Sequence, residues 1–200
     1  MFTGIVQAVG KLKSRAERGG DVRLEFEAGR LPPDIIRVGD SIAVNGCCLT
    51  VIEKQAQGFA ADASRETLAL TTLGALVVGS AVNLEASLTL AMPLGGHLVL
   101  GHVDGVGTVT NRRDDARSVR FEIEAPAELG HYIARKGSVC VDGVSLTANG
   151  VNAKGFDVNI IPHTLEHTIL KDWRPGARVN LEVDLLARYL ERLLRSESKL

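Results

Sequence analysis

The chain has 200 residues, 45% of them hydrophobic, and its 23 basic and 24 acidic side chains leave a formal net charge of −1. This balance excludes the basic surface expected for nucleic-acid binding and favours a small molecule or a soluble partner. Three cysteines, two of them adjacent, cannot form the disulfide framework of a small secreted domain. The first residues lack the pattern of a signal peptide, and no apolar run reaches the roughly 18–20 residues of a membrane helix. We therefore expect a cytoplasmic protein that does not enter membranes.

The first half of the chain predicts short strands separated by turn residues. Residues 21–27 alternate strictly between polar and apolar side chains, which is typical of a half-buried strand. Asn45-Gly46 is a tight-turn signal between two further strands. The strands are expected at 5–12, 21–27, 41–44, 48–52, 58–63 and 81–86, with a short helical or turn segment at 66–73.

The second half predicts the same order of elements. Its strands are expected at 103–109, 118–124, 138–141, 145–151, 156–160 and 178–183, and Pro162 is placed to open a short helix. Short strands with turns and no long helix between them favour a small antiparallel barrel in each half; a pair of small sandwiches is the alternative. With a linker at 88–96, the expected units are residues 1–96 and 97–184.

The tail at 185–200 has no counterpart in the first half. Its apolar residues recur at the spacing of an amphipathic helix: Leu186, Tyr189, Leu190, Leu193 and Leu194. A helix of this length is marginal alone in water, so it requires a groove on its own barrels or on other copies of the chain. Because the helix follows two complete units, we favour self-association over packing within one chain.

The two halves agree because the chain is a tandem duplication. The stretch VNGCCLT at 44–50 returns as VDGVSLT at 141–147, and further matches keep this offset of 97 residues without a gap. A duplicated barrel offers two similar pockets to two similar ligands. The copies differ in polar groups, which suits a reaction between two molecules of one substrate. The unlike pairs are Ile5 and His102, Asn45 and Asp142, Cys48 and Ser145, Glu66 and His163, and Ser87 and Asp184.

These polar groups also have structural interpretations. Cys48 could fill a core, His102 could be a satisfied strand histidine, and Asp184 could cap the tail helix. His97 and His102, five residues apart, are a weak metal signal. The sequence has no phosphate-binding glycine loop of standard spacing and no nucleophile-elbow pattern.

Several motifs together resemble the riboflavin synthase family of lumazine-binding tandem barrels. They are MFTGIV at 1–6, NGCCLT at 45–50, GGH at 95–97, GHV at 101–103, DGVSLT at 142–147 and IPHTL at 161–165. The resemblance extends from residue 1 to about 189. It implies an all-β fold of two six-stranded Greek-key barrels, a C-terminal helix that joins three chains, and neither cofactor nor metal.

The resemblance also implies a reaction. Two molecules of 6,7-dimethyl-8-ribityllumazine exchange a four-carbon unit and give riboflavin and 5-amino-6-(D-ribitylamino)uracil. The active site forms where the N-terminal barrel of one chain meets the C-terminal barrel of a neighbour. An association of the trimer with lumazine synthase, the enzyme that makes the lumazine, is left open.

The same resemblance implies the site residues. The N-terminal pocket would be lined by Gly4, Ile5, Val6, Cys48, Leu49, Thr50, Asp62, Ala63, Ser64, Arg65, Glu66 and Thr67. The C-terminal pocket would be lined by Gly101, His102, Val103, Lys136, Ser145, Leu146, Thr147, Ile160, Ile161, Pro162, His163, Thr164 and Leu165. Phe2 and Thr3 match an N-terminal segment that contributes at the site, and Phe2 is counted among the catalytic residues.

A mechanism follows as a hypothesis from the chemistry of the lumazine. Its C7 methyl is acidic because the carbanion delocalises into the ring, so the protein must mainly hold two rings together and activate one of them. Cys48 is a candidate nucleophile, and His102 is a candidate proton shuttle. Ser145, Thr147 and Asp184 would relay protons or orient the anion. Lys136 and Thr50 would bind ring carbonyls or ribityl hydroxyls.

Two rival functions use a similar scaffold. A lumazine-carrying protein would bind the chromophore without converting it, but it needs only one good pocket, and this chain keeps both motifs. A flavin-binding barrel of a reductase needs a nucleotide-binding domain, for which this chain has no room.

Overall fold

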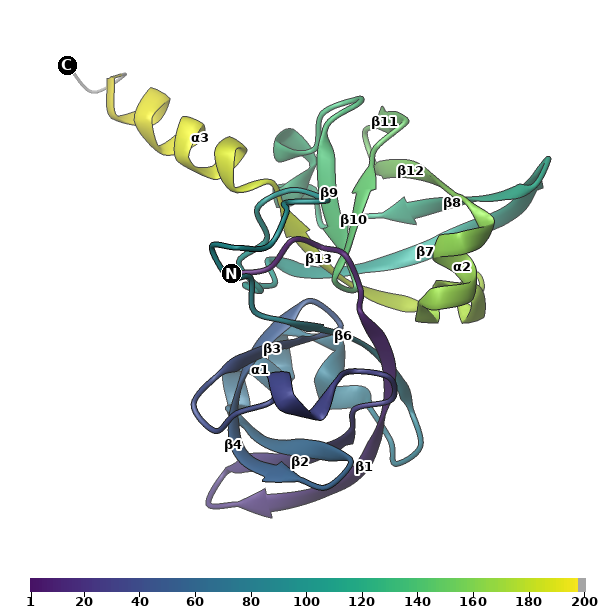
Figure 1. Cartoon of the computed structure of the whole chain (residues 1–200). Helices are drawn as coiled ribbons and strands as arrows, with labels where there is room; N and C mark the ends of the chain where they lie inside the picture. The colour runs from purple at the N-terminus through teal and green to yellow at the C-terminus, as the bar shows by residue number, and fades with distance from the viewer. Residues whose placement is uncertain (198–200) are drawn as a thin grey trace.

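A computed structural model describes residues 1–197 and shows two β units with a C-terminal helix (Figure 1). In the first unit, the strands close into an antiparallel barrel in the order β1-β2-β5-β4-β3-β6. The strands are β1 (Ala8–Arg18), β2 (Asp21–Glu27), β3 (Ser41–Val44), β4 (Cys47–Gln55), β5 (Gly58–Ala63) and β6 (Ala81–Ala86). Helix α1 (Arg65–Leu70) and 3-10 turns at Pro33–Ile35 and Thr72–Ala75 lie between them.

The second unit curls a seven-stranded sheet in the order β10-β9-β13-β7-β8-β12-β11. Its strands are β7 (Gly105–Asp115), β8 (Ser118–Glu124), β9 (Ser138–Val141), β10 (Val144–Thr147), β11 (Gly150–Asn152), β12 (Gly155–Ile160) and β13 (Arg178–Val183). Helix α2 (Pro162–His167) begins at the predicted proline, and 3-10 turns occupy Ala127–Tyr132 and Ile169–Asp172. The prediction of two tandem all-β units is confirmed.

The seventh strand arises because the strand expected at 145–151 is divided. In the first unit, β4 stays continuous past a bulge between Val51 and Glu53 and pairs with both β3 and β5. In the second unit, β10 pairs with β9, and the ladder between β11 and β12 begins only at Gly150 opposite Asp157. At the position equivalent to the β4 bulge, the second unit interrupts the strand altogether, so one strand becomes β10 and β11. The order of the strands is otherwise the same in both units.

Other strand bounds differ from the prediction mainly at the first strand of each unit. Strands β1 and β7 start later than predicted because the residues before them are extended segments outside the ladders. They also run further, since the β1–β2 and β7–β8 hairpins continue beyond the core with exposed residues, where apolar alternation has stopped. The strands at 21–27, 41–44, 58–63, 81–86, 118–124, 138–141 and 178–183 have the predicted bounds.

Each unit buries its own apolar core. Phe26 and Phe59 lie at the centre of the first core, with ring centroids 5.3 Å apart. Phe121 and Trp173 meet edge to face in the second core, also at 5.3 Å. Burial of such side chains is the main favourable term in folding, so each half has a driving force of its own.

The two units meet through four buried polar side chains, which we call the turn interlock: Asn45, Asn83, Asp142 and Asn180. The Asn83 amide donates to the Asp142 carbonyl at 2.8 Å, and the Asn180 amide donates to the Asn45 carbonyl at 2.8 Å. Within each unit, the Asn83 N–H donates to Asn45 Oδ1 and the Asn180 N–H donates to Asp142 Oδ1, both at 2.8 Å. Because the residues are related by the repeat, the contact has pseudo-twofold symmetry.

The glycines of the two turns allow this close approach. Gly46 has φ +76° and Gly143 has φ +79°, a region that favours glycine. A Cβ at Gly46 would lie 2.7 Å from the backbone N of Gly143, and the reverse distance is 2.8 Å. The turn signal seen in the sequence therefore also serves the contact between units.

Two extended segments run along the same axis, and we call them the first strap (residues 2–4) and the second strap (residues 99–101). Phe2 and Val99 pair through backbone hydrogen bonds of 2.7 and 3.0 Å. Their side chains form a small buried cluster with Ala43 and Cys140. The straps are thus fixed in the space between the two units.

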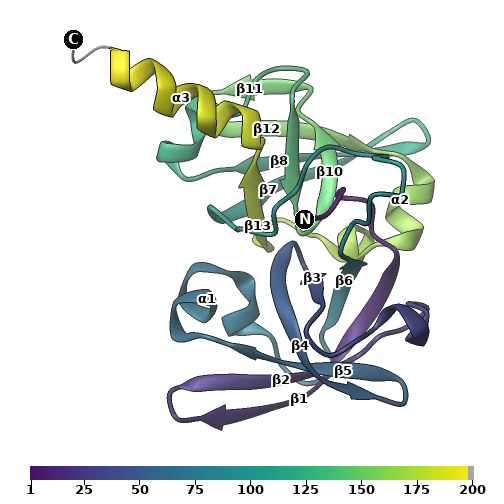
Figure 2. The same cartoon turned by 60° about the vertical axis from the view of Figure 1, so that its left-hand side comes forward.

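Helix α3 (Leu185–Glu197) follows β13, runs beside the second unit and lies far from the first unit (Figures 1 and 2). Its base is held by an ion pair of 2.7 Å between Arg188 and Asp104, and the Tyr132 hydroxyl donates to Glu191. The predicted apolar stripe is 59–67% exposed: Leu186, Tyr189, Leu190, Leu193 and Leu194. The rest of the expected tail, 198–200, lies outside the described residues.

The helices of residues 1–197 include none that is long and apolar enough to cross a membrane.

The Asp142 carboxyl makes the turn interlock sensitive to pH. Burial raises its pKa from 3.8 to about 7. Between these values the folded chain keeps a proton that the unfolded chain has lost, so the free energy of unfolding falls as pH rises. We expect Asp142→Asn, which copies the residue of the first turn, to reduce this slope.

Urea unfolding at about pH 5 and pH 8 measures the slope. Glu182, whose pKa burial also raises to about 7, leaves part of the slope in place. The matched control is Asp62→Asn, at an exposed aspartate. Equal slopes in Asp142→Asn and the unmodified chain would contradict the prediction.

Candidate functional site

A cavity of about 310 Å³ lies where the second strap meets the first unit. Strand β4, helix α1 and the residues after the second strap form its walls. The lining residues are Cys47, Cys48, Glu66, Thr67, Leu70, Thr71, Gly101, His102 and Val103. Its volume is at the lower end of the range typical of small-molecule pockets. We call it the first pocket.

Helix α1 is positioned by its own capping residues. Ser64 is the N-cap, and its hydroxyl accepts the Thr67 N–H at 3.2 Å. At the other end, the Thr71 hydroxyl donates to the Thr67 carbonyl at 2.6 Å. These bonds fix the helix so that Thr67 and Thr71 border the cavity.

The second strap completes this first pocket. The Cys48 N–H donates to the Gly101 carbonyl at 2.9 Å. Gly101 has φ +81°, and a Cβ there would lie 2.6 Å from Cys48 Cβ, so the strap requires glycine. Val103 packs against the first core, and His102 is exposed at the cavity wall.

The first strap lies at the equivalent place in the second unit. The Ser145 N–H donates to the Gly4 carbonyl at 2.7 Å. Gly4 has φ +74°, and a Cβ there would lie 2.6 Å from Ser145 Cβ. Val6 packs against the second core. Because this region, around Ser145, the first strap and α2, is equivalent by the repeat to the first pocket, we call it the second pocket.

The straps are therefore exchanged, and the predicted assignment of two segments was wrong. Gly4, Ile5 and Val6 lie at the second unit, not at the N-terminal pocket, and Gly101, His102 and Val103 lie at the first unit. The reason is that each strap crosses the pseudo-twofold axis before its unit begins. Aligning the repeats shows that the two segments are equivalent, but not which unit each one contacts.

A buried glutamate on the last strand of each unit holds a strap. Glu85 accepts the Thr3 N–H at 2.7 Å, the Thr3 hydroxyl at 2.6 Å and the Gly4 N–H at 3.0 Å. Glu182 accepts the Leu100 N–H at 2.7 Å and the Gly101 N–H at 2.9 Å. Burial raises the pKa of both carboxyls, that of Glu182 to about 7.

His97 is a candidate functional residue that the sequence analysis missed. Its Nδ1 lies 2.7 Å from Ser145 Oγ. Burial lowers the pKa of the imidazole, and the charge of Asp184 acts in the opposite direction. Within the described part of the chain, His97 Nε2 is buried without a hydrogen-bond partner. A neutral imidazole in this position can accept the Ser145 proton.

The two histidines weighed as a metal pair belong to different pockets. His97 contacts Ser145 in the second unit, whereas His102 lines the first pocket. Among residues 1–197, no three His, Cys, Asp or Glu side chains are grouped so that they could bind a metal ion. The GGH motif was the one signal in the sequence that could have pointed to His97.

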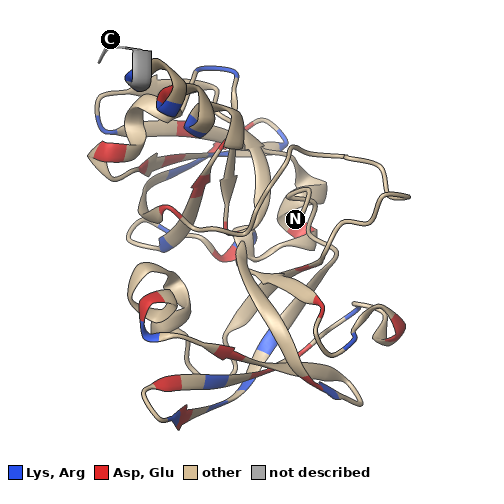
Figure 3. Cartoon of the chain, turned by 90° about the vertical axis from the view of Figure 1, so that its left-hand side faces the viewer, with Lys and Arg blue, Asp and Glu red and all other residues tan. Residues whose placement is uncertain are grey.

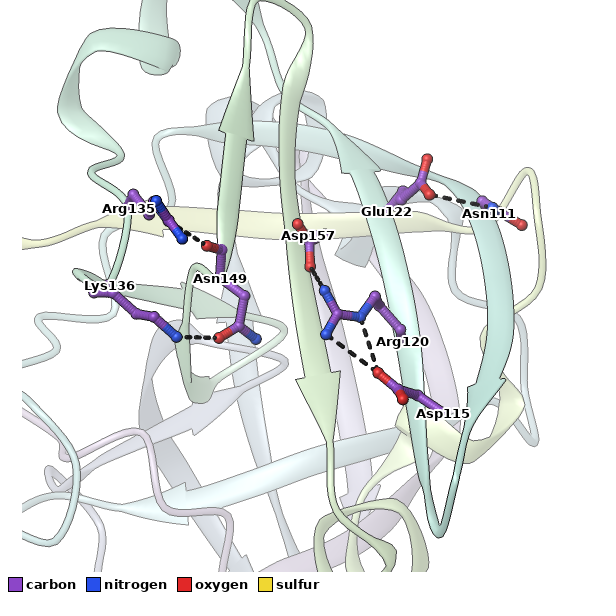
Figure 4. Close-up of polar contacts among 8 residues, drawn as sticks. All are labelled: Asn111, Asp115, Arg120, Glu122, Arg135, Lys136, Asn149 and Asp157. Atoms are coloured by element: carbon purple, nitrogen blue, oxygen red, sulfur yellow. Dashed lines mark hydrogen bonds and ion pairs between the residues drawn. The ribbon is translucent and has the colours of Figure 1, made fainter.

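Other predicted site residues have structural partners. The Asp184 carboxylate accepts the Leu186 N–H at 2.9 Å, so it caps α3 while its charge acts on His97. Phe2, the first residue of the first strap, is fully buried against Val99 and Cys140. Lys136 is exposed, and its Nζ donates to Asn149 Oδ1 at 3.0 Å on the outer face of the sheet (Figure 4).

The same outer face carries further polar contacts. Arg120 pairs with Asp115 at 3.2 Å and with Asp157 at 2.8 Å (Figure 4). Figure 3 shows acidic and basic residues interspersed over both units. Recognition at the pockets therefore has to depend on shape and hydrogen bonds more than on a field of one sign.

Of the remaining residues predicted for the N-terminal pocket, some are buried in the core and others are exposed. Leu49 and Ala63 are buried in the first core, and Thr50 is exposed. Asp62 pairs with Arg23 at 3.0 Å, and Arg65 donates to a backbone carbonyl at Gly20. Their side chains are thus engaged on the outer face of the barrel, while Glu66 and Thr67 reach the cavity.

The residues predicted for the C-terminal pocket divide in the same way. Ile160 is in the second core, and Leu146 and Leu165 pack against it. Thr147 and Ile161 are exposed, and Pro162 and Thr164 are on α2. His163 stacks on His167 with ring centroids 4.2 Å apart, at positions equivalent to Glu66 and Leu70 of the first pocket.

Comparison with known proteins identifies the repeated unit. The family model described as the lumazine binding domain matches residues 3–87 and again residues 100–184. A riboflavin synthase of Photobacterium phosphoreum is 44% identical over 97% of this chain and 89% of the relative. Riboflavin synthases of Brucella abortus and Mycobacterium bovis are 46% and 45% identical, over 96% and 98% of this chain and 98% and 99% of the relatives.

Solved structures show the same arrangement. The crystal structure of LumP complexed with 6,7-dimethyl-8-(1'-D-ribityl) lumazine matches with a TM-score of 0.80 and 27% identity, over 92% of this chain and 99% of that chain. The structure of LumP complexed with riboflavin matches with a TM-score of 0.82 and 28% identity, over the same shares.

We expect the His97 imidazole to be neutral at pH 7, because its burial lowers the pKa below the ordinary value. NMR titration of the histidine ring protons would measure this, with His97→Gln identifying the resonance. A His97 signal that titrates above the ordinary histidine value of about 6.5 would contradict the expected desolvation.

Proposed function

The chain belongs to the riboflavin synthase family, and we propose that its two pockets hold the two substrate molecules of that reaction. The chain is an enzyme of riboflavin biosynthesis. Two molecules of 6,7-dimethyl-8-ribityllumazine give riboflavin and 5-amino-6-(D-ribitylamino)uracil by transfer of a four-carbon unit. The observation that supports the use of both pockets is that each half repeats the contacts between a strap, a buried glutamate and a pocket strand.

The two pockets carry different reactive side chains on an equivalent backbone. In the first pocket, Cys48 is a candidate nucleophile and His102 a candidate proton shuttle at the cavity wall. In the second pocket, Ser145 and His97 lie within hydrogen-bond distance and can exchange a proton. We propose that one substrate loses its C7 methyl proton while the other ring is activated for attack, each in its own pocket.

The protein accelerates the reaction mainly by holding the two substrate rings in a fixed orientation. A well-oriented pair of reactants can gain up to roughly 7–11 kcal/mol relative to reactants that meet in solution. The lumazine carbanion is stabilised by its own ring. Besides orienting the two rings, the protein therefore needs only groups that transfer protons and hydrogen bonds that activate one ring. Thr50 and Lys136 are proposed to contact ring carbonyls or ribityl hydroxyls, and Thr147 to relay protons or orient the anion.

We further propose that the active site joins the first pocket of one chain to the second pocket of a neighbour in a homotrimer. Exposed apolar side chains next to the second pocket support this, because Ile5 and Ile161 are 48% and 55% exposed. Leu70 at the first pocket is 53% exposed. The apolar stripe of α3 supplies a surface that can associate with copies of itself.

Three finer assignments accompany this proposal. We place the protein in the cytoplasm, since its three cysteines are free thiols, as expected in a reducing compartment. We divide the chain into a first unit at 1–96, a second unit at 97–184 and an oligomerisation helix at 185–200. Association with lumazine synthase stays a prediction of the family resemblance, which co-sedimentation of the two purified proteins would test.

The direct test of function is to mix the purified protein with 6,7-dimethyl-8-ribityllumazine alone. Riboflavin should form at half the rate at which the lumazine disappears, because each turnover consumes two lumazines. Binding of the lumazine without formation of riboflavin would instead indicate a carrier and would overturn the proposal.

We expect His102→Gln and Cys48→Ser each to lower turnover by far more than they lower lumazine affinity, because both side chains lie at the first pocket. Steady-state rates give turnover, and lumazine fluorescence titration of the same variants gives affinity as the control. Wild-type turnover in both variants would remove these residues from the chemistry.

Deleting the residues after Asp184 should dissociate the oligomer and abolish activity, while each unit still binds lumazine. Analytical ultracentrifugation measures the assembly, and Arg192→Ala, an exposed polar position on the same helix, is the control. If the truncated chain still sediments as a trimer, the role assigned to α3 is wrong.

A further inference from the structure

Two buried carboxylates that the proposed chemistry does not use occupy equivalent places in the two units. Glu85 on β6 is 4% exposed and Glu182 on β13 is 3% exposed. Transfer of a charged carboxylate from water to a protein interior is costly unless hydrogen bonds compensate it. Because the duplication retains this costly group in both copies, each one should serve a purpose that an apolar residue could not.

Glu182 is linked to the first pocket by a short series of hydrogen bonds. Its carboxylate oxygens accept the N–H groups of Leu100 and Gly101 at 2.7 and 2.9 Å. The Gly101 carbonyl in turn accepts the Cys48 N–H at 2.9 Å. His102 is the next residue along the chain, so the bonds made by Glu182 fix where the two reactive side chains of this pocket lie relative to each other.

Glu85 makes the equivalent link at the second pocket. It accepts the Thr3 N–H and hydroxyl and the Gly4 N–H, and the Gly4 carbonyl accepts the Ser145 N–H at 2.7 Å. In each case, the glutamate belongs to one unit and the pocket to the other.

We propose that Glu182 is the positioning residue of the first pocket and Glu85 that of the second, so that each unit holds in place the strap that completes the pocket of the other. The positioning follows from contacts within one chain, whereas its effect on turnover rests on the proposed function. Neither glutamate has to touch substrate.

A Glu182→Gln substitution should disturb this contact at nearly constant size. The amide keeps one acceptor oxygen but turns the other into a donor, which then faces a strap N–H. One buried N–H loses its partner, which is an unfavourable change for the end of the strap at Gly101. The strap should therefore open locally and uncover Cys48, which is half-buried, while Cys47 and Cys140 stay buried in their cores.

Thiol labelling of the folded protein measures this opening without reference to catalysis. With a maleimide or disulfide reagent and mass spectrometry to locate the label, Glu182→Gln should label at Cys48 about tenfold faster than the unmodified chain. Glu85→Gln is the matched control, because its strap contacts Ser145, and it should label at close to the unmodified rate.

A second pair of variants keeps the proposal falsifiable if a glutamine variant does not fold. Gly101→Ala pushes the second strap away from Cys48, and Gly4→Ala pushes the first strap away from Ser145, since each Cβ would lie 2.6 Å from its neighbour. Faster Cys48 labelling is expected in the first variant and not in the second.

Turnover of lumazine supplies the second readout. Glu182→Gln should lower kcat, and Glu182→Asp, which keeps the charge on a shorter side chain, should recover part of the loss. Equal Cys48 labelling in both glutamine variants, or none above the unmodified rate, would overturn the positioning role. Faster labelling only in Glu182→Gln supports it even if no form of the protein converts lumazine, a result that would overturn the proposed function alone.

Discussion

The side-chain amides of Asn83 and Asn180 each donate to a turn carbonyl of the opposite unit, and these two buried bonds lie at the centre of the contact between the halves of the chain. Breaking one would leave a buried donor and a buried acceptor unpaired, which costs more than a surface contact is worth. The same strands carry Glu85 and Glu182 two residues further on, so the interlock also places the carboxylates that bind the straps. Strands β6 and β13 therefore both join the two units and position the straps that complete the pockets.

This arrangement explains how a duplicated protein acquires two pockets with the same backbone structure but different side chains. The backbone bonds from strap to pocket strand are the same in both halves, at Cys48 and at Ser145. The side chains on that frame differ, with His102 beside the thiol in one half and His97 beside the hydroxyl in the other. Similar frames suit two copies of one substrate, and unlike side chains suit different roles for each copy. A carrier protein would need only one such pocket.

Much of the fold follows from the sequence because its signals are local. The repeat, the alternation at 21–27, the turn at Asn45 and the helix start at Pro162 all depend on neighbouring residues, and the structure agrees with them. The exchange of the straps could not be predicted, because it depends on contacts between residues far apart in the sequence, Gly101 with Cys48 and Gly4 with Ser145. The division of one strand into β10 and β11 depends on which neighbouring strands each part pairs with. The contact of His97 with Ser145 depends on the path of the linker, whose sequence has no periodic pattern that would indicate a structure.

If one reaction uses the first pocket of one chain and the second pocket of a neighbour, two inactive variants should complement each other. One chain carries Cys48→Ser with His102→Gln, and a second chain carries Ser145→Ala with His97→Gln. Each is inactive alone, and the two are unfolded and refolded together so that mixed trimers form. Riboflavin synthesis should return in the mixture, because an intact first pocket then meets an intact second pocket across a chain boundary. A mixture as inactive as its components, although mixed trimers are present, would contradict it and would place the reaction within a single chain.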